Sequence, residues 1–250
     1  MNKVTKALAA IMLIVAAVIV AGCNKPDEPN EPNNGGNNGG GGNGDTPDGH
    51  EYVDLGLPSG TLWATCNVGA AIPEDYGNYF AWGETHPQNG MYNWYSYNYC
   101  NANYHALTKY CTLAEYGYEG FTDNLTVLQS EDDAATANWG GSWYTPSKEQ
   151  WEELYQNTTI TFAIQNEVRG MSFTASNGKS IFLPAAGYYW DSELNVLGNY
   201  GNYWSSSLNT DGNPNGAWGF YFATSTSVDD FMDSFGRARG QSVRPVRSAE

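Results

Sequence analysis

The distribution of apolar and polar residues divides the chain into three parts. An unbroken apolar run at 7–20 follows Lys3 and Lys6, and residues 24–49 then contain no large apolar side chain other than proline. From residue 51 onwards, short β-prone runs alternate with turn residues, which indicates a packed domain that contains several strands. The pattern predicts a short apolar leader, a polar linker and one globular domain.

Several segments of the domain are predicted to be β-strands. The runs at 217–222 and 242–247 are expected to be its last strands, and Pro245 places the second at an edge or a bulge because proline donates no backbone hydrogen bond. Hairpins are expected where two β-prone runs flank turn residues. The first joins 52–55 to 61–64 through Pro58, Ser59 and Gly60. The second joins 172–176 to 179–183 through Asn177 and Gly178.

Residues 146–155 indicate a helix, because Trp151, Leu154 and Tyr155 form one apolar stripe at helical spacing. Ser147, followed three residues later by Gln150, is a capping box that starts it.

A second, shorter helix is expected at 131–137. Residues 75–110 are dense in Tyr, Trp, Asn and Gly without a regular period, so they are expected to form long ordered loops held by aromatic side chains. Together these elements predict an α+β fold, with a twisted antiparallel sheet, one or two helices and long loops.

Residues 1–22 resemble the signal peptide of a bacterial lipoprotein. The basic start, the apolar run and the small residues before Cys23 stand in the order of a lipobox. The resemblance implies that Cys23 receives lipid such as palmitate and anchors the protein in a membrane. An asparagine directly after the cysteine, here Asn24, resembles a sorting signal for the outer membrane. The stretch 25–28 resembles a surface-export signal, although a proline interrupts it. The alternatives are an ordinary signal peptide or an uncleaved anchor.

Residues 23–50 are rich in Pro, Asn and Gly and are expected to form a disordered tether. The domain then spans 51–250, and a chain of this length can bury a sizeable core without a disulfide scaffold. The net charge of −16 argues against a nucleic-acid partner, because phosphate binding needs clustered cations.

Four cysteines leave three once Cys23 carries lipid. In an oxidising compartment, Cys100 and Cys111 are expected to close a loop as a disulfide. Cys66 would then remain as a small buried side chain.

No cofactor and no metal site are predicted. The histidines show no metal-ligand spacing. Asp211, Asn213, Asn215 and Gly216 match the first half of a calcium loop, but Phe222 stands where the terminal acid is required.

Several segments together resemble one family, the Fibrobacter succinogenes major paralogous domain family of bacterial surface proteins. The resemblance covers nearly all of 51–247 and rests on VDLGLPSGTLWA at 53–64, GGSWYTPS at 140–147, EQWE at 149–152, LPAAGY at 183–188, YWSSS at 203–207 and GQSVRPVR at 240–247.

The resemblance implies a C-type-lectin-like fold, similar to that of the variable proteins that diversity-generating retroelements mutate. It also implies a ligand-binding face between 207 and 239, which would take a protein or a glycan. Its short polar side chains and few apolar anchors suit an adaptable contact surface. The candidate contact residues are Asn209, Asp211, Asn213, Asn215, Ser225, Ser227, Asp229, Asp230, Phe231, Met232, Asp233, Ser234, Phe235, Arg237 and Arg239.

We expect no enzymatic activity. The formylglycine-generating branch of this fold needs reactive cysteines late in the domain, whereas Cys66, Cys100 and Cys111 all lie before residue 112. An enzyme acting on surface polysaccharide, or a purely structural surface protein, are the alternatives to a recognition module.

Arg244 and Arg247 have two interpretations. Their guanidinium groups would either pin the last strand to helix acids such as Glu152 or Glu153, or bind an anionic ligand, and the structural role is preferred.

Overall fold

The computed structural model describes residues 44–45, 49–140, 142–212, 214–225 and 231–249. The predicted signal peptide, Cys23 and nearly all of the predicted tether lie outside these residues. No helix in the described part of the chain is long and apolar enough to cross a membrane.

The described residues form a mostly β structure with two short α-helices. The helices are α1 (Ala134–Trp139) and α2 (Lys148–Asn157). Short 3-10 turns cover Ala114–Tyr116, Tyr118–Gly120 and Ser130–Asp132. The strands are β1 (Gly44–Asp45), β2 (Glu51–Asp54), β3 (Thr61–Ala64), β4 (Thr158–Gln165), β5 (Val168–Ala175), β6 (Ser180–Pro184), β7 (Tyr188–Trp190), β8 (Glu193–Asn195), β9 (Tyr200–Leu208), β10 (Gly216–Ala223), β11 (Met232–Gly236) and β12 (Val246–Ser248).

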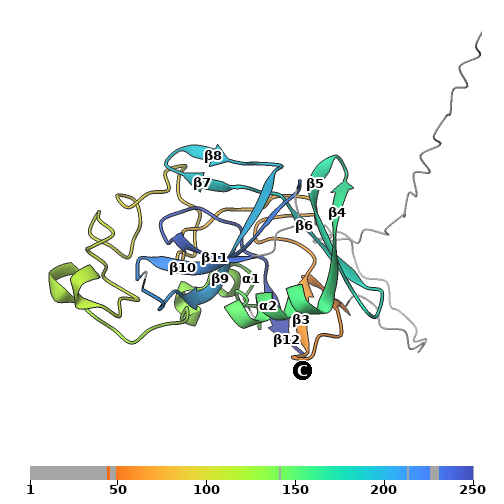
Figure 1. Ribbon diagram of the computed structural model, residues 1–250, viewed down its shortest axis with the longest axis horizontal. Helices are drawn as coiled ribbons and strands as arrows, with labels where there is room; N and C mark the ends of the chain where they lie inside the picture. The colour runs from red at the N-terminus through yellow and green to blue at the C-terminus, as the bar shows by residue number, and fades with distance from the viewer. Residues whose placement is uncertain (1–43, 46–48, 141, 213, 226–230, 250) are drawn as a thin grey trace, which may run out of the picture.

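All strand pairings within the named sheets are antiparallel. The sheet orders are β1-β2-β3-β12, β11-β10-β9, β4-β5-β6 and β7-β8. Figure 1 shows β4, β5 and β6 on one side of the molecule and the long loops on the other, with β9, β10 and β11 between them. The architecture is therefore α+β-like, with several small sheets in place of the single twisted sheet that was predicted.

Both predicted hairpins are confirmed. β2 pairs with β3, with Val53 opposite Trp63, and β5 pairs with β6, with Phe173 opposite Ile181. The predicted strand 217–222 is confirmed as the centre of β10.

The last strand is shorter than predicted and lies at the edge of its sheet. Val246 pairs with Trp63, but Ser242 instead forms a bridge with Tyr203 of another sheet. The chain therefore passes from one sheet to the next immediately before Pro245, where no backbone donor is needed.

The helix α2 starts as predicted. The Ser147 hydroxyl accepts a hydrogen bond from the Gln150 backbone amide, and the Gln150 side chain accepts one from the Ser147 amide. Trp151 and Leu154 are buried on the inner side, and the Trp151 ring stacks on Phe220 of β10 with centroids 4.6 Å apart. The helix thereby covers one face of the β9–β10–β11 sheet.

The shorter helix begins later than predicted. Asp133 is its N-cap, with its carboxylate accepting from the amides of Ala135 and Thr136. Because this cap fixes the start of α1, the preceding residues 130–132 form only a 3-10 turn.

Two hydrophobic cores lie on opposite faces of the β9–β10–β11 sheet. The main core joins this sheet to α2 and to the sheets of β3 and β5, through residues such as Trp63, Trp151, Phe173, Tyr203 and Phe220. The second core joins the other face to the long loops and α1, through Phe80, Trp82, Tyr110, Ala135 and Trp204.

The loops at 75–110 are ordered by aromatic side chains, as predicted. The Tyr97 hydroxyl donates to the Trp82 carbonyl (2.8 Å), and the Tyr92 hydroxyl donates to the Tyr79 carbonyl (2.6 Å). Trp82 and Tyr110 meet edge to face with centroids 4.9 Å apart. Ring contacts and buried hydroxyl bonds hold these residues in place of regular secondary structure.

The carboxylate of Asp132 connects three parts of the loop region. It accepts hydrogen bonds from the Tyr99 hydroxyl, the Tyr110 hydroxyl and the Lys109 ammonium. Burial by itself raises the pKa of Asp132, but these three hydrogen bonds outweigh it and hold the pKa below its usual value of 3.8. The ionised carboxylate therefore stabilises the folded loops.

The predicted disulfide between Cys100 and Cys111 is absent, and both cysteines are free. The Cys100 thiol donates to the Trp94 carbonyl, and the Cys111 thiol to the Leu113 carbonyl. Cys66 is buried, as predicted, but it is disulfide-bonded and so is not left over as an unpaired side chain.

Arg244 is completely buried and structural, but its partners are not the predicted acids. Its guanidinium donates to Asn67 Oδ1 and to the backbone carbonyls of Ala64, Thr65 and Phe182. Glu152 and Glu153 are engaged elsewhere, with Lys148 and Ser59 respectively. The Arg247 guanidinium lies near the rings of Tyr52 and Trp143.

The Asp132 cluster predicts a pH-dependent stability. A carboxyl whose pKa is depressed in the folded state stabilises it above the unfolded pKa, and the gain is lost as the pH falls through the folded pKa. Asp132→Asn should lower the free energy of unfolding by about 2 kcal/mol at pH 7, and the difference from the unsubstituted chain should shrink below pH 3.8. Urea unfolding at several pH values measures this.

Glu131→Gln is the matched control, because Glu131 is a neighbouring exposed acid 3.9 Å from the same ammonium. It should have little effect at any pH. A loss in Asp132→Asn that is equal at pH 3 and pH 7 would contradict the role of the ionised carboxylate.

Arg244→Met should destabilise the domain strongly, because it leaves three backbone carbonyls and the Asn67 amide oxygen without their donor. We expect a loss of about 3–5 kcal/mol in the free energy of unfolding, followed by tryptophan fluorescence in urea. Arg169→Met is the control, since Arg169 makes a single 3.4 Å hydrogen bond and is half-exposed. Equal stabilities of the two variants would show that the Arg244 contacts are dispensable.

Candidate functional site

The predicted ligand-binding stretch consists of the end of β9, the strands β10 and β11 and their connections. Side chains alternate between the two faces of these strands. Phe220 and Met232 are cross-strand partners in the main core under α2. Gly219 and Asp233, the neighbouring pair, belong to the opposite face.

The two polar connections lie at opposite ends of β10. Residues 209–215 adjoin the loop at 126–127, since the Leu208 amide donates to the Thr126 carbonyl. Thr224 starts the other connection and donates to the Asn199 carbonyl. The eight residues of β10 separate these ends by about 23 Å. The two connections therefore start about 23 Å apart, and we take the strand surface between them as the candidate site.

This surface carries a row of rings and charges that we call the Arg239 strip, made of Tyr188, Tyr221, Asp233, Phe235 and Arg239. The rings of Tyr221 and Phe235 meet edge to face at 6.0 Å. The Arg239 guanidinium carbon lies 5.6 Å from the Phe235 centroid and 4.8 Å from the Tyr188 centroid. These contacts join Tyr221, Phe235, Arg239 and Tyr188 into one half-exposed row, and the exposed Asp233 belongs to the strip by its place on β11.

Gly219 makes this row possible. A Cβ built there would lie 2.8 Å from Phe235 Cδ2 and 3.0 Å from the Tyr203 carbonyl oxygen. The missing side chain lets Phe235 lie across β10 and reach Tyr221. Glycine is required here by close approach of the Phe235 ring, because Gly219 is not among the residues with positive φ.

The Arg239 guanidinium is positioned by aromatic rings and not by hydrogen bonds to the residues that the structure describes. Two aromatic rings flank it, and it makes no ion pair or side-chain hydrogen bond with any described residue. Arginine stacked on rings keeps its planar donors free to bind a carboxylate or another acceptor. The strip therefore presents a positioned cation on a chain of net charge −16.

Asp233 places a carboxylate on the same face of β11 as Phe235, because the two residues are two positions apart in the strand. Its side chain is exposed, and one oxygen accepts from the Ser234 amide at 2.7 Å. The other oxygen remains available for a ligand. The strip thus offers an acceptor, a cation and aromatic surface together.

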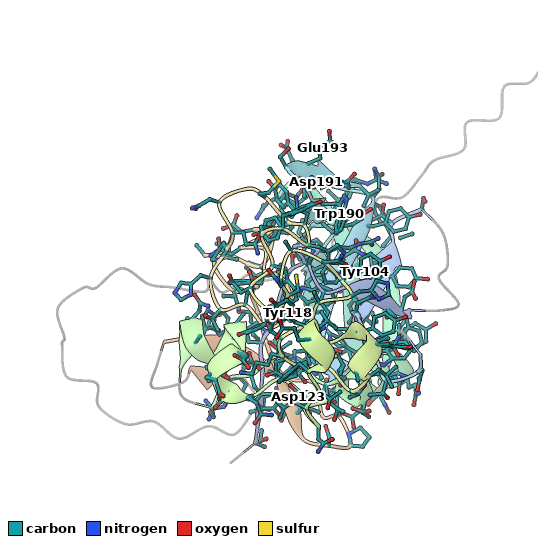
Figure 2. All side chains as sticks on the ribbon, turned by 90° about the vertical axis from the view of Figure 1, so that its left-hand side faces the viewer. Tyr104, Tyr118, Asp123, Trp190, Asp191 and Glu193 are labelled. Atoms are coloured by element: carbon teal, nitrogen blue, oxygen red, sulfur yellow. The ribbon has the colours of Figure 1, made fainter. Side chains whose placement is uncertain are left out.

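The neighbouring β7–β8 hairpin is fixed by the loop region. Tyr189 bridges to Gly240, and the Asn93 side-chain amide donates to Asp191 Oδ1 at 2.7 Å. Figure 2 shows Glu193 at one end of this side of the molecule, followed by Asp191 and Trp190, with Tyr104 and Tyr118 near the middle and Asp123 toward the other end.

The predicted contact residues are distributed over several environments. Asp211, Ser225 and Asp233 are exposed, and Asn215, Phe231, Ser234, Phe235 and Arg239 are partly exposed. Asn209, Met232 and Arg237 are buried. Asn213, Ser227, Asp229 and Asp230 lie outside the described residues.

The expectation of an accessible contact residue is wrong for Arg237, Met232 and Asn209. Arg237 is fully buried, and its Nη1 donates to the carbonyls of Lys109 and Tyr110. Met232 belongs to the main core. The Asn209 side chain is used locally, since its Oδ1 accepts from the Asp211 amide.

Phe231 also has a structural contact, because its ring stacks on Tyr155 of α2 with centroids 3.5 Å apart. Conversely, the sequence prediction missed Tyr188 and Tyr221. Tyr221 lies within a predicted strand, but the alternation of residues along that strand does not show which ring or charged group of another strand lies next to Tyr221. Tyr188 is more than thirty positions before Phe235 and meets Arg239 only through the fold.

In the part of the chain that the structure describes, no group of three or more His, Cys, Asp or Glu residues is arranged to hold a metal ion. Asp211, from the partial calcium pattern, is exposed.

Comparison with known proteins gave no match: no protein-family model, no curated protein and no solved structure matches this chain.

Gly219→Ala should disturb the strip. The added methyl group forces Phe235 away, and we expect the free energy of unfolding to fall by about 1–3 kcal/mol. In a Phe235→Ala background the same substitution should cost less, so a double-mutant cycle in urea measures the coupling.

Gly236→Ala is the matched control for this cycle, because its Cβ would approach nothing closer than Trp94 at 3.5 Å. Additive effects of Gly219→Ala and Phe235→Ala would contradict the proposed contact.

Proposed function

We propose that this protein is a surface lipoprotein whose C-type-lectin-like domain recognises a protein or glycan ligand. Cys23 would carry the lipid and anchor the chain in the outer membrane, and the stretch 23–50 would tether the domain. These parts of the proposal rest on the sequence resemblances alone. The antiparallel sheets, the short helices and the long ordered loops are compatible with the proposed fold.

The Arg239 strip is the observation that supports recognition most directly. Aromatic side chains provide contact area at a small cost in conformational entropy, because few torsions have to be fixed. Phe235 and Arg239 are already ordered by their neighbours, so ligand binding would require little further ordering.

The burial of the predicted contact residues supports a narrower face than the one predicted from the sequence. Exposed Asp233 and half-exposed Phe235 and Arg239 form one surface, whereas Arg237 and Met232 support it from inside. We therefore assign recognition to the Arg239 strip, and the connections at its two ends would extend the contact only for a large ligand.

Arg239→Gln tests this assignment in the full-length chain, with immobilised mucin and a glycan array as probes. Loss of the guanidinium should weaken binding about tenfold or more, since a charge-assisted contact contributes roughly 1.5–3 kcal/mol. The midpoint of thermal unfolding should change little, because Arg239 makes no side-chain hydrogen bond with described residues.

Lys179→Gln is the control, because it makes the same change in charge next to the Asn177–Gly178 turn of the β5–β6 hairpin. Unchanged binding in this variant, with loss in Arg239→Gln, supports the strip. If both variants bind as the unsubstituted chain does, or if the unsubstituted chain binds neither probe, the proposed recognition site is wrong.

A further inference from the structure

A polar pocket in the loop region has no role in the proposed function. It is a hollow of about 360 Å³ that is wide open to solvent. None of its residues belongs to the Arg239 strip. The lining residues are Glu84, His86, Pro87, Gln88, Asn89, Met91, Ser96 and Asn98.

A buried carboxylate lines this pocket. Glu84 is only 4% exposed, and its oxygens accept from the Asn98 backbone amide (2.8 Å) and from Gln88 Nε2 (2.7 Å). No Lys, Arg or His in the described part of the chain forms an ion pair with it, and burial raises the pKa of Glu84. Each carboxylate oxygen can accept a second hydrogen bond, so Glu84 retains unused capacity.

Gln88 adds a second unused acceptor. Its Nε2 is fixed by Glu84 and by the Ser96 carbonyl (3.1 Å), which orients the amide. Its Oε1 is buried and has no hydrogen-bond donor in the described part of the chain. An unpaired buried acceptor costs about 1–3 kcal/mol, which a donor from a ligand would offset.

The pocket wall is held rigidly. The Gln88 backbone amide donates to the Tyr92 hydroxyl, which itself donates to the Tyr79 carbonyl. The Ser96 hydroxyl donates to the Met91 carbonyl at 2.7 Å. The acceptors are therefore preorganised before any ligand arrives.

The remaining wall combines amides with apolar surface. The side chains of Asn89 and Asn98 are exposed and carry both donors and acceptors. Met91 is 46% exposed, and Pro87 adds a second apolar surface. A ligand that fits must present several hydroxyl donors and acceptors next to an apolar face, which is the chemistry of a sugar ring.

We propose that this pocket binds a neutral saccharide unit, with ligand hydroxyls donating to Glu84 and Gln88 and pairing with the amides of Asn89 and Asn98. An anionic sugar fits less well, because the buried Glu84 carboxylate would repel it. This second site is independent of the Arg239 strip.

A titration of the ¹⁵N-labelled full-length chain with methyl glycosides of glucose, galactose, mannose and N-acetylglucosamine tests the proposal by NMR. At least one glycoside should cause saturable shifts of the Asn89 and Asn98 side-chain amides. Asn98→Ala and Asn89→Ala should each weaken that binding about fivefold. The Asn98 backbone amide still holds Glu84 in Asn98→Ala, so the pocket keeps its shape.

Asn124→Ala is the matched control, an exposed asparagine outside the pocket, and it should leave the affinity unchanged. Arg239→Gln should also leave it unchanged, which separates this site from the proposed function. The inference is overturned if no glycoside gives saturable shifts up to solubility, if Asn89→Ala and Asn98→Ala bind normally, or if a simple alkylamine binds in preference to every glycoside.

Discussion

The buried guanidinium of Arg244 is the interaction on which the arrangement of the sheets depends. It binds carbonyls at the end of β3, the Asn67 side chain that follows and the Phe182 carbonyl of β6. Burial lowers the pKa of Arg244 to about 10, so the group remains cationic at neutral pH. Burying a cation is less costly where its donors are hydrogen-bonded, and all three Arg244 guanidinium nitrogens donate to oxygens here. Because these oxygens come from β3, from the residues just after it and from β6, the Arg244 side chain holds the C-terminal segment next to both strands.

Fixing this junction positions the β9–β10–β11 sheet between two cores. Ser242 pairs with Tyr203 two residues before Arg244, which connects the junction directly to β9. One sheet face is then covered by α2 through Trp151, and part of the other is covered by the loops through Trp82 and Trp204. The Arg239 strip lies where this second cover ends, which is why its side chains are ordered and still partly exposed.

The loop region combines order with polar surface for a related reason. Tyrosine and tryptophan rings fill space without a regular backbone, and their polar atoms pair with carbonyls or with the Asp132 carboxylate. A region built in this way keeps many polar groups near its surface. The Glu84 pocket is one result, and its acceptors are rigid because Tyr92 and Ser96 hold the surrounding backbone. The two proposed sites therefore lie on different kinds of structure. The Arg239 strip lies on a strand surface, and the Glu84 pocket lies in a loop held by side-chain hydrogen bonds.

The sequence alone determined the local elements, because turn chemistry, capping and periodicity act within a few residues. Asn177–Gly178 set the β5–β6 hairpin, and Ser147 with Gln150 set the start of α2. Tertiary structure decided which residues meet. Arg237 and Arg239 look equivalent in sequence, yet one is buried beneath Trp82 and the other lies half-exposed against Tyr188. Whether a side chain is buried depends on how the sheets and loops pack. So does its contact with a residue more than thirty positions away. Neither can be predicted from a local sequence pattern.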